Sequence, residues 1–184
     1  MRNVRRLAEE ETVPDELAHR TNRKLSPGWH YPLGATPGLG GVNFSLFSAT
    51  AEEVWLLLFD RPDGDPTDVI RVKDRDRFAW HVFVHGAVAG QLYGYKVRGP
   101  FDPARGLRFN DRKLLIDPYA KALTGKIVNE ENLLLAYDPG DPARDLSLDR
   151  RGNQAVVPKA IVVDDRFDWG EDAPPSIPLE RMVI

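Results

Sequence analysis

The sequence predicts an all-β fold, an antiparallel β-sandwich with long loops and a C-terminal linker. Short apolar or alternating runs follow one another closely between residues 41 and 98, and turns containing Gly, Pro and Asp separate them. No stretch there shows the 3.6-residue period of an amphipathic helix. Closely spaced short strands without helical periodicity are typical of a sandwich.

The N-terminal region is polar and proline-rich. Residues 1–24 carry few apolar side chains and predict a flexible N-terminal tail, in which a short helix could begin at Pro14 and run through Leu17. Residues 25–41 are rich in Pro and Gly and read as loop and turn. Their glycines lead into a strand rather than a helix N-terminus, which argues against a phosphate-binding loop.

Alternation defines the predicted strands. Val42, Phe44 and Leu46 fall on one face of their run, whereas the run at 53–59 is almost wholly apolar and suits a strand covered on both faces. Residues 74–77 read as a charged turn. The predicted strands before Gly90 are 41–48, 53–59, 68–72 and 78–84.

The next strand places Tyr93, Tyr95 and Val97 on one face and ends at Gly99-Pro100, because proline donates no backbone hydrogen bond. A turn-rich connection leads to the apolar run 113–116, and residues 120–123 suggest one helical turn.

Polar loop-like sequence fills 129–158, followed by a strand-like run at 159–164 and an acidic, proline-containing linker at 165–178. We therefore expect a β-sandwich over 25–125 and an extended connection and linker over 126–184.

Composition narrows the function classes. The net charge of −3 gives no reason to expect nucleic acid or a membrane surface as a partner, and the absence of cysteine excludes disulfides and thiolate chemistry. Neither a secretory signal nor a long apolar span is recognisable, so we expect a cytoplasmic protein. His81 and His85 are about 13 Å apart along a strand, too far to suggest a metal site. No cofactor is expected.

Three segments in order carry a resemblance. The longest spans residues 93–123 and contains YGYKVRGPFDP, RFN and KLLIDPYAKAL. The others are YPLGAT, which runs into GVNFSLFS at 41–48, and VVD with FDW at 162–169. Together they resemble the N-terminal domain of bacterial glycogen debranching enzymes of the isoamylase type, in the α-amylase superfamily, over roughly residues 25–184.

That resemblance implies an immunoglobulin-like sandwich of the early-set type, similar to glucan-binding modules of carbohydrate-binding family 48. It implies a parent enzyme that hydrolyses α-1,6 branch linkages in glycogen or limit dextrin with two carboxylates. Those carboxylates would lie on a (β/α)8 barrel whose first strand begins near Arg181. We therefore expect no catalytic residue in this chain.

The resemblance also implies a glucan site made by Trp80, Lys96 and Asn110. Two of the three have a plainer interpretation: Trp80 is in phase with Val82 and Val84 and could be a core residue, and Lys96 could be a solvated strand residue. A further exposed tryptophan found in such modules is absent, since the matching place reads Phe59-Asp60-Arg61-Pro62.

Two functions follow for the chain itself. One is a binding module for α-glucan, and the other is a structural domain that docks on the barrel through an exposed apolar surface. The parent could also be a trehalose-forming or branching enzyme, although the motifs at 41–48 and 113–123 favour debranching.

Overall fold

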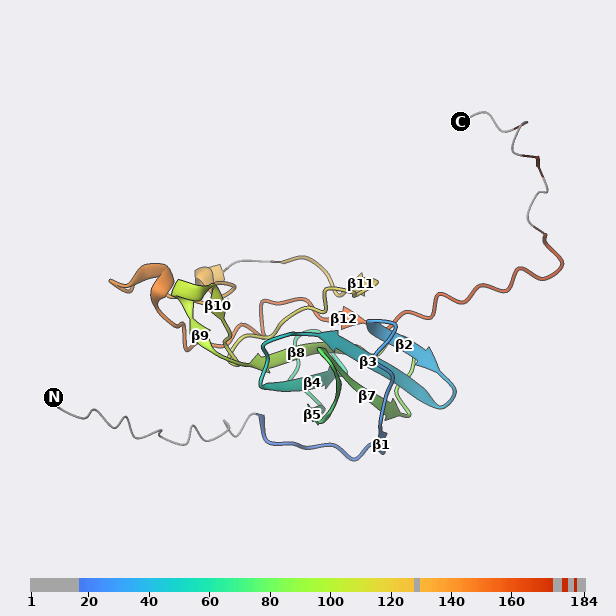
Figure 1. Cartoon of the computed structure of the whole chain (residues 1–184), viewed down its shortest axis with the longest axis horizontal. Coiled ribbons are helices and arrows are strands. Elements are labelled where there is room, and N and C mark those ends of the chain that lie inside the picture. Colours follow the sequence, from blue (N-terminus) through green and yellow to red (C-terminus); the bar gives the residue numbers. More distant parts are fainter. Residues whose placement is uncertain (1–16, 128–129, 174–176, 179–180, 182–184) are drawn as a thin grey trace.

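A computed structural model describes residues 17–127, 130–173, 177–178 and 181. Its strands form two antiparallel sheets, with a small hairpin beside them (Figure 1). This confirms the all-β antiparallel prediction. The finer immunoglobulin-like assignment stays a prediction.

The first sheet is built around one central strand pair. Its order is β1-β7-β3-β2, and β6 pairs with β7 beyond the end of β1. The bounds are β1 Leu25–Ser26, β2 Gly34–Gly38, β3 Gly41–Phe47, β6 Asp74–Asp76 and β7 Ala79–His85.

The second sheet has the order β11-β12-β8-β4-β5. Its strands are β4 Glu53–Phe59, β5 Asp68–Val72, β8 Leu92–Arg98, β11 Ala122–Leu123 and β12 Ala160–Ile161. The separate hairpin pairs β9 (Phe101–Asp102) with β10 (Leu107–Arg108) around the 3-10 turn η2 (Pro103–Arg105). Two further 3-10 turns are η3 (Glu130–Asn132) and η4 (Arg144–Leu146).

The main core lies between the two sheets. Phe44 from β3, Val82 from β7 and Tyr95 from β8 belong to one buried cluster, as the period-2 pattern requires. A second cluster covers the opposite face of β4 and includes Trp55 and Leu57. The prediction that β4 is covered on both faces is therefore confirmed.

Three sequence predictions of local structure are wrong. Residues 34–38 form a strand rather than loop, 74–76 form β6 rather than a turn, and 122–123 pair with β12 rather than making a helical turn. The partner of residues 122–123 is distant in the sequence, at Ala160–Ile161. Strands β2 and β6 instead pair with the strands that follow them, β3 and β7, in short hairpins. Pro37 is tolerated because β2 is an edge strand, where a missing N–H leaves no ladder bond unmade.

Part of the predicted N-terminal tail is packed against the second sheet. Arg20 forms a β-bridge with Val69 of β5, and Leu17 is buried in the second cluster. Thr21 and Arg23 contact the Asp68 carboxylate. The folded unit thus begins by residue 17, before the predicted boundary at 25, and the helix expected from Pro14 lies mainly outside the described residues.

The folded unit also extends past residue 125. Asp149, Asn153 and Lys159 are buried, and β12 adds a strand to the edge of β8. Beyond β12 the described chain leads away from the sheets (Figure 1). Among the described residues no helix has the length and apolar character needed to cross a membrane.

Candidate functional site

Trp80 lies in the core between the sheets. Its side chain is 8% exposed and packs with Leu46 and Val82 in the main cluster. The Arg75 guanidinium lies 4.9 Å from its ring centroid. Trp80 therefore presents little ring surface to a sugar in this structure.

Lys96 lies on the opposite face of β8 from Tyr95 and Val97. Its cross-strand neighbour is Trp55, a member of the second cluster. At 3% exposure Lys96 is not the solvated strand residue that sequence allowed. Trp80 and Lys96 thus belong to different layers, and the fold does not bring them together on one surface.

Asn110 is 9% exposed, and its amide is engaged within the protein. Nδ2 donates to the carbonyl oxygens of Asp149 (2.7 Å) and Ala136 (3.3 Å). Oδ1 accepts from the Arg112 N–H at 3.0 Å. Asn110 therefore holds two loops together, and a role for Trp80, Lys96 and Asn110 in glucan binding stays a prediction.

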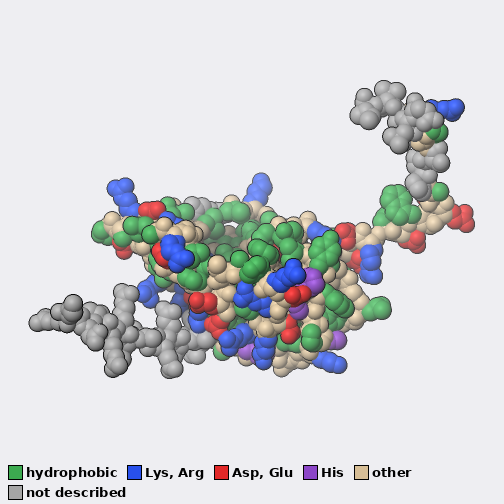
Figure 2. Space-filling view, viewed as in Figure 1, with side chains coloured by type: hydrophobic (Ala, Val, Ile, Leu, Met, Phe, Trp, Pro, Cys, Tyr) green, Lys and Arg blue, Asp and Glu red, His purple; other side chains and the backbone are tan. Residues whose placement is uncertain are grey.

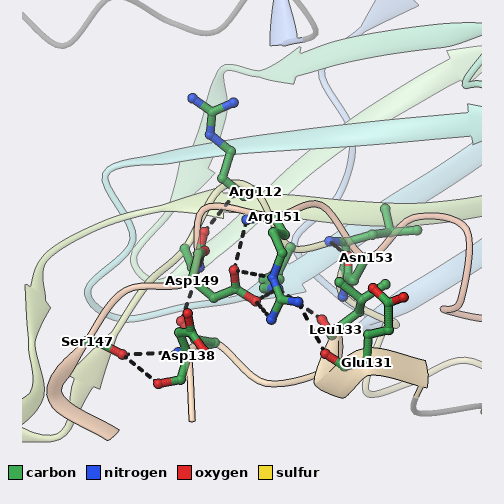
Figure 3. A network of polar contacts seen from close by, with 12 residues as sticks. Arg112, Glu131, Leu133, Asp138, Ser147, Asp149, Arg151 and Asn153 are labelled. Atoms are coloured by element: carbon green, nitrogen blue, oxygen red, sulfur yellow. Dashed lines mark hydrogen bonds and ion pairs between the residues drawn. The ribbon is translucent and has the colours of Figure 1, made fainter. Parts of the chain in front are cut away.

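The polar contacts around Asn110 form a frame between the 110–116 segment and the 133–153 segment (Figure 3). Lys113 Nζ donates to Asp149 Oδ2 and to the Leu133 carbonyl oxygen, both at 2.9 Å. Asn153 accepts from the Leu114 N–H at 2.6 Å and donates to the Leu114 carbonyl oxygen at 3.1 Å. These contacts fix both segments against the second sheet.

Asp149 is the charged centre of this frame. Burial opposes its ionisation, yet hydrogen bonds from Arg151 and Lys113 outweigh burial and hold the Asp149 pKa well below its usual range. The Lys113–Asp149 ion pair is almost completely buried. Removal of Asp149 would leave the Lys113 ammonium buried without its counter-ion, whereas Asp149 also pairs with Arg151. Because these charges are paired with one another and the Lys113–Asp149 pair is closed to solvent, we interpret the frame as a structural element rather than an open polar site.

An apolar groove opens beside the frame. Its volume is about 660 Å³, and its walls come from the β9–β10 hairpin, the 110–116 segment and the loops up to Val157. Five polar residues also line it: Thr50, Arg108, Asn110, Lys113 and Asn153. The last four make hydrogen bonds to other parts of the protein. The apolar lining residues include Val97, Leu107, Phe109, Leu114, Leu115, Ile116, Ile127, Leu134 and Val157.

Large apolar side chains are exposed at the rim of this groove. Leu115 is 45% exposed and Ile127 is 58% exposed. The backbone of Leu115 pairs with Tyr95 of β8, so this side chain is held in place rather than carried on a loose loop. Hydrophobic side chains gather on this side of the molecule, over β10 and the neighbouring loops (Figure 2). Such a surface suits apolar side chains of another protein surface better than sugar hydroxyls.

The described residues offer no acid–base pair in the groove. Burial raises the pKa of Asp117 above its ordinary value, but its carboxylate accepts from the Tyr93 hydroxyl at 2.8 Å and does not line the groove. Within the described ranges no cluster of three or more His, Asp or Glu side chains could hold a metal ion.

Apart from Asn110, the residues that build the frame were not singled out from the sequence. Asp149 and Asn153 lie in polar sequence that reads as loop, and Lys113 opens an otherwise apolar run. A useful signal was present: Lys113-Leu114-Leu115-Ile116 is too apolar for an uncovered loop.

Two similar proteins with curated names are both glycogen debranching enzymes. The chain is 41% identical over 161 residues to the glycogen debranching enzyme of Serratia proteamaculans, covering 88% of this chain and 23% of that protein. It is 43% identical over 160 residues to the glycogen debranching enzyme of Yersinia enterocolitica, covering 87% and 23%. The chain therefore spans about a quarter of the length of these relatives.

Among solved structures, the chain is similar to a pullulanase from Paenibacillus barengoltzii, with 27% identity and a TM-score of 0.43. The match covers 52% of this chain and 13% of that chain. A family model matches residues 32–120, which include β2 to β8, both halves of the β9–β10 hairpin and the Lys113 segment. On this match, residues 32–120 belong to the carbohydrate-binding module 48 family, the isoamylase N-terminal domain.

Proposed function

We propose that this chain is the N-terminal accessory domain of a glycogen-debranching glycoside hydrolase. Relatives named glycogen debranching enzyme match nearly all of this chain and are about four times as long, which supports a larger parent protein. In the proposed parent, α-1,6 branch linkages of glycogen or limit dextrin are hydrolysed by two carboxylates outside this chain. Its cytoplasmic location stays a prediction.

The role proposed for the chain itself is to support the catalytic part of the same polypeptide. The apolar groove carries this proposal, because its lining residues Asn110, Lys113 and Asn153 make their hydrogen bonds within the chain while Leu115 and Ile127 stay partly exposed at its rim. Covering these side chains with apolar surface of the catalytic part would remove them from water, at about 25 cal/mol for each Å² buried.

The activity test compares the 184-residue chain with the complete gene product on glycogen limit dextrin. Release of new reducing ends by the complete product, with none from the 184-residue chain, is expected. Activity in the 184-residue chain, or a complete product inactive on branched glucan, would contradict the proposal.

The docking test places Leu115→Ser or Ile127→Ser in the complete gene product. Both variants should lower its thermal unfolding midpoint and its debranching activity, while Leu39→Ser serves as the matched control because Leu39 is 99% exposed in the β2–β3 turn. The same substitutions should leave the fold of the 184-residue chain intact. If the groove variants have the same unfolding midpoint and activity as Leu39→Ser in the complete protein, the proposed docking role is wrong.

Glucan binding by Trp80, Lys96 and Asn110 is the second candidate, supported by the carbohydrate-binding description of the family. Trp80→Ala is a poor test, because removing a core tryptophan costs about 3–5 kcal/mol and would unfold much of the protein. Titration with maltoheptaose, followed by NMR of the Trp80 indole and the Lys96 and Asn110 amides, needs no substitution. Shifts at these signals would support the site, and unchanged signals would exclude it.

A further inference from the structure

The outer face of the first sheet is crossed by the segment at residues 26–31. Two buried polar side chains of β3 hold its backbone. Asn43 accepts from the Trp29 N–H at 2.7 Å and donates to the Trp29 carbonyl oxygen at 2.9 Å. Ser45 donates to the His30 carbonyl oxygen at 2.8 Å. These three hydrogen bonds, made by side chains on the face of β3, bind the backbone of the segment to the sheet.

The contact between segment and sheet is close at Gly28. A Cβ atom there would lie 2.3 Å from Asn43 Oδ1 and 2.8 Å from the backbone carbon of Val82. Only glycine permits this approach, so the path of residues 28–30 is fixed by the sheet beneath them. Side chains that project from a fixed path lose little backbone entropy when a ligand binds.

Two aromatic side chains project into solvent from this segment. Trp29 is 63% exposed and makes a T-shaped contact with Phe83, with ring centroids 5.7 Å apart and planes at 78°. Tyr31 is 75% exposed. Neither residue contributes to the main core or to the second cluster, so core packing does not explain them.

An exposed polar pair also involves this segment. His30 Nδ1 is 3.1 Å from Asp76 Oδ2, and both side chains are more than half exposed. The pair stands between Trp29 and Tyr31 in sequence and offers hydrogen-bonding groups to solvent. Apolar ring faces next to exposed hydrogen-bonding groups match the two-sided chemistry of a sugar ring, which has C–H faces and a hydroxyl rim.

We propose that Trp29 and Tyr31, together with the exposed His30–Asp76 pair that joins the same segment to β6, form a contact surface for α-glucan on the outer face of the first sheet. The choice of α-glucan rests on the proposed function, whereas the surface itself rests on the geometry. Trp29 and Tyr31 precede the residues 32–120 matched by the family model and do not line the apolar groove. The surface is separate from the other candidate residues because Trp80 is buried between the sheets, whereas Lys96 lies on the outer face of the second sheet and Asn110 is bound to the loop at Asp149.

The surroundings favour a sugar over a protein partner. Next to Trp29 the outer face of β3 presents Asn43 and Ser45, whose polar atoms already bind the 26–31 segment. A stable protein interface buries roughly 800 Å² on each partner and has an apolar centre. Two separate aromatic rings with an adjacent ion pair fit one or two glucosyl units instead.

Affinity electrophoresis of the 184-residue chain tests the proposal. Native gels contain glycogen, a β-glucan such as hydroxyethyl cellulose, or no polysaccharide. Trp29→Ala and Tyr31→Ala are compared with Trp169→Ala, a matched control because Trp169 is 67% exposed on the segment beyond β12. Urea unfolding midpoints equal to that of the wild-type chain establish that each variant is folded.

Retardation by glycogen but not by the β-glucan is expected for the wild-type chain. Trp29→Ala and Tyr31→Ala should each raise the dissociation constant at least about fivefold, whereas Trp169→Ala should not change it. No retardation of the wild-type chain, or equal retardation of all three variants, would overturn the proposal. Equal retardation by both polysaccharides would also overturn it, since it would indicate general adhesion.

NMR gives a second measurement on the unsubstituted chain. Maltoheptaose should shift the indole N–H signal of Trp29, and signals of Trp55 in the second cluster should stay unchanged. Shifts confined to Trp80 and Lys96 would refute the Trp29 surface and favour the other glucan site. Either result leaves the debranching assay and the Leu115→Ser comparison unaffected, so failure here is distinguishable from failure of the proposed function.

Discussion

At the residue scale, Tyr93 and Tyr95 are neighbouring buried tyrosines whose hydroxyl groups differ in their hydrogen bonding. Both rings are buried in the main core, with centroids 6.0 Å apart. The Tyr93 hydroxyl donates to Asp117 at 2.8 Å. The Tyr95 hydroxyl is buried and has no hydrogen-bond partner within the described part of the chain. Burial raises the pKa of both phenols, and the Asp117 carboxylate adds to the effect.

This difference predicts opposite results for the same substitution. Tyr93→Phe leaves the buried Asp117 carboxylate without one donor and should lower the free energy of unfolding by about 1–3 kcal/mol. Tyr95→Phe removes a buried hydroxyl that makes no bond and should be neutral or stabilising. Urea unfolding of the two variants measures both, and equal destabilisation would contradict this assignment of the Asp117 contact.

Asp149 predicts a pH dependence. Its folded-state pKa lies below the unfolded value, so the stabilisation it provides is present above about pH 4 and is lost as the pH falls further. Asp149→Asn should cost about 3–5 kcal/mol at pH 7, because Lys113 stays buried without its counter-ion. The difference from wild type should shrink below about pH 4.

The control for this prediction is Asp145→Asn, which breaks the exposed Arg108–Asp145 pair. It should cost less than about 1 kcal/mol at any pH. Urea midpoints measured between pH 3 and pH 7 compare the two variants. A pH-independent effect of Asp149→Asn would show that the carboxylate charge is not what stabilises the frame.

The strand face on which a side chain lies could be predicted from the sequence, but whether that face is buried often could not. Alternation correctly placed Val82 and Val84 in the core. It did not decide whether Trp80 is a core residue or part of a glucan site. Lys96 is buried because residues far along the chain cover the outer face of β8, and strand periodicity carries no information about that cover. Asn110 has the same explanation, since its partners lie at 136 and 149.

At the element scale, strand prediction succeeded where both faces or one face had a clear pattern. The bounds of β4 and β5 were predicted as observed, and β3, β7 and β8 were predicted to within one residue. The strands that the sequence did not predict are all short or lie at a sheet edge: β1, β2, β6, β9, β10 and β11. Strands β1 and β11 depend on partners distant in the sequence, whereas β2, β6 and β9 pair with the next strand in a hairpin. The run at 159–164 was recognised as strand-like, but only Ala160–Ile161 is paired as β12.

The segment before β1 behaves as part of the second sheet. Arg20 and Val69 exchange two backbone hydrogen bonds at 2.9 and 2.8 Å, and Leu17 is fully buried against the second cluster. Leu17→Ala should therefore cost about 2–5 kcal/mol of unfolding free energy. Leu39→Ala, at a fully exposed leucine, is the control and should have almost no effect. Equal thermal unfolding midpoints for the two variants would contradict the packing of Leu17 and support the sequence-based prediction that residues 17–24 form a tail.

At the scale of the whole molecule, two surfaces on different layers have different chemistry. The apolar groove lies beside the loops that cover the second sheet, and the Trp29–Tyr31 surface lies on the outer face of the first sheet. A domain with this arrangement can dock on a catalytic part through one side and leave the other side open to glucan. The two roles considered from the sequence are thus assigned to separate places on the fold.

Hydrogen–deuterium exchange tests the docking role most directly. Exchange is measured on the 184-residue chain and on the complete gene product, for peptides that cover residues 105–116 at the groove and residues 28–40 on the other face. Slower exchange in the complete protein at 105–116, with no change at 28–40, is the result expected if the groove is covered by the catalytic part. Identical exchange at 105–116 in both proteins would contradict docking through this groove.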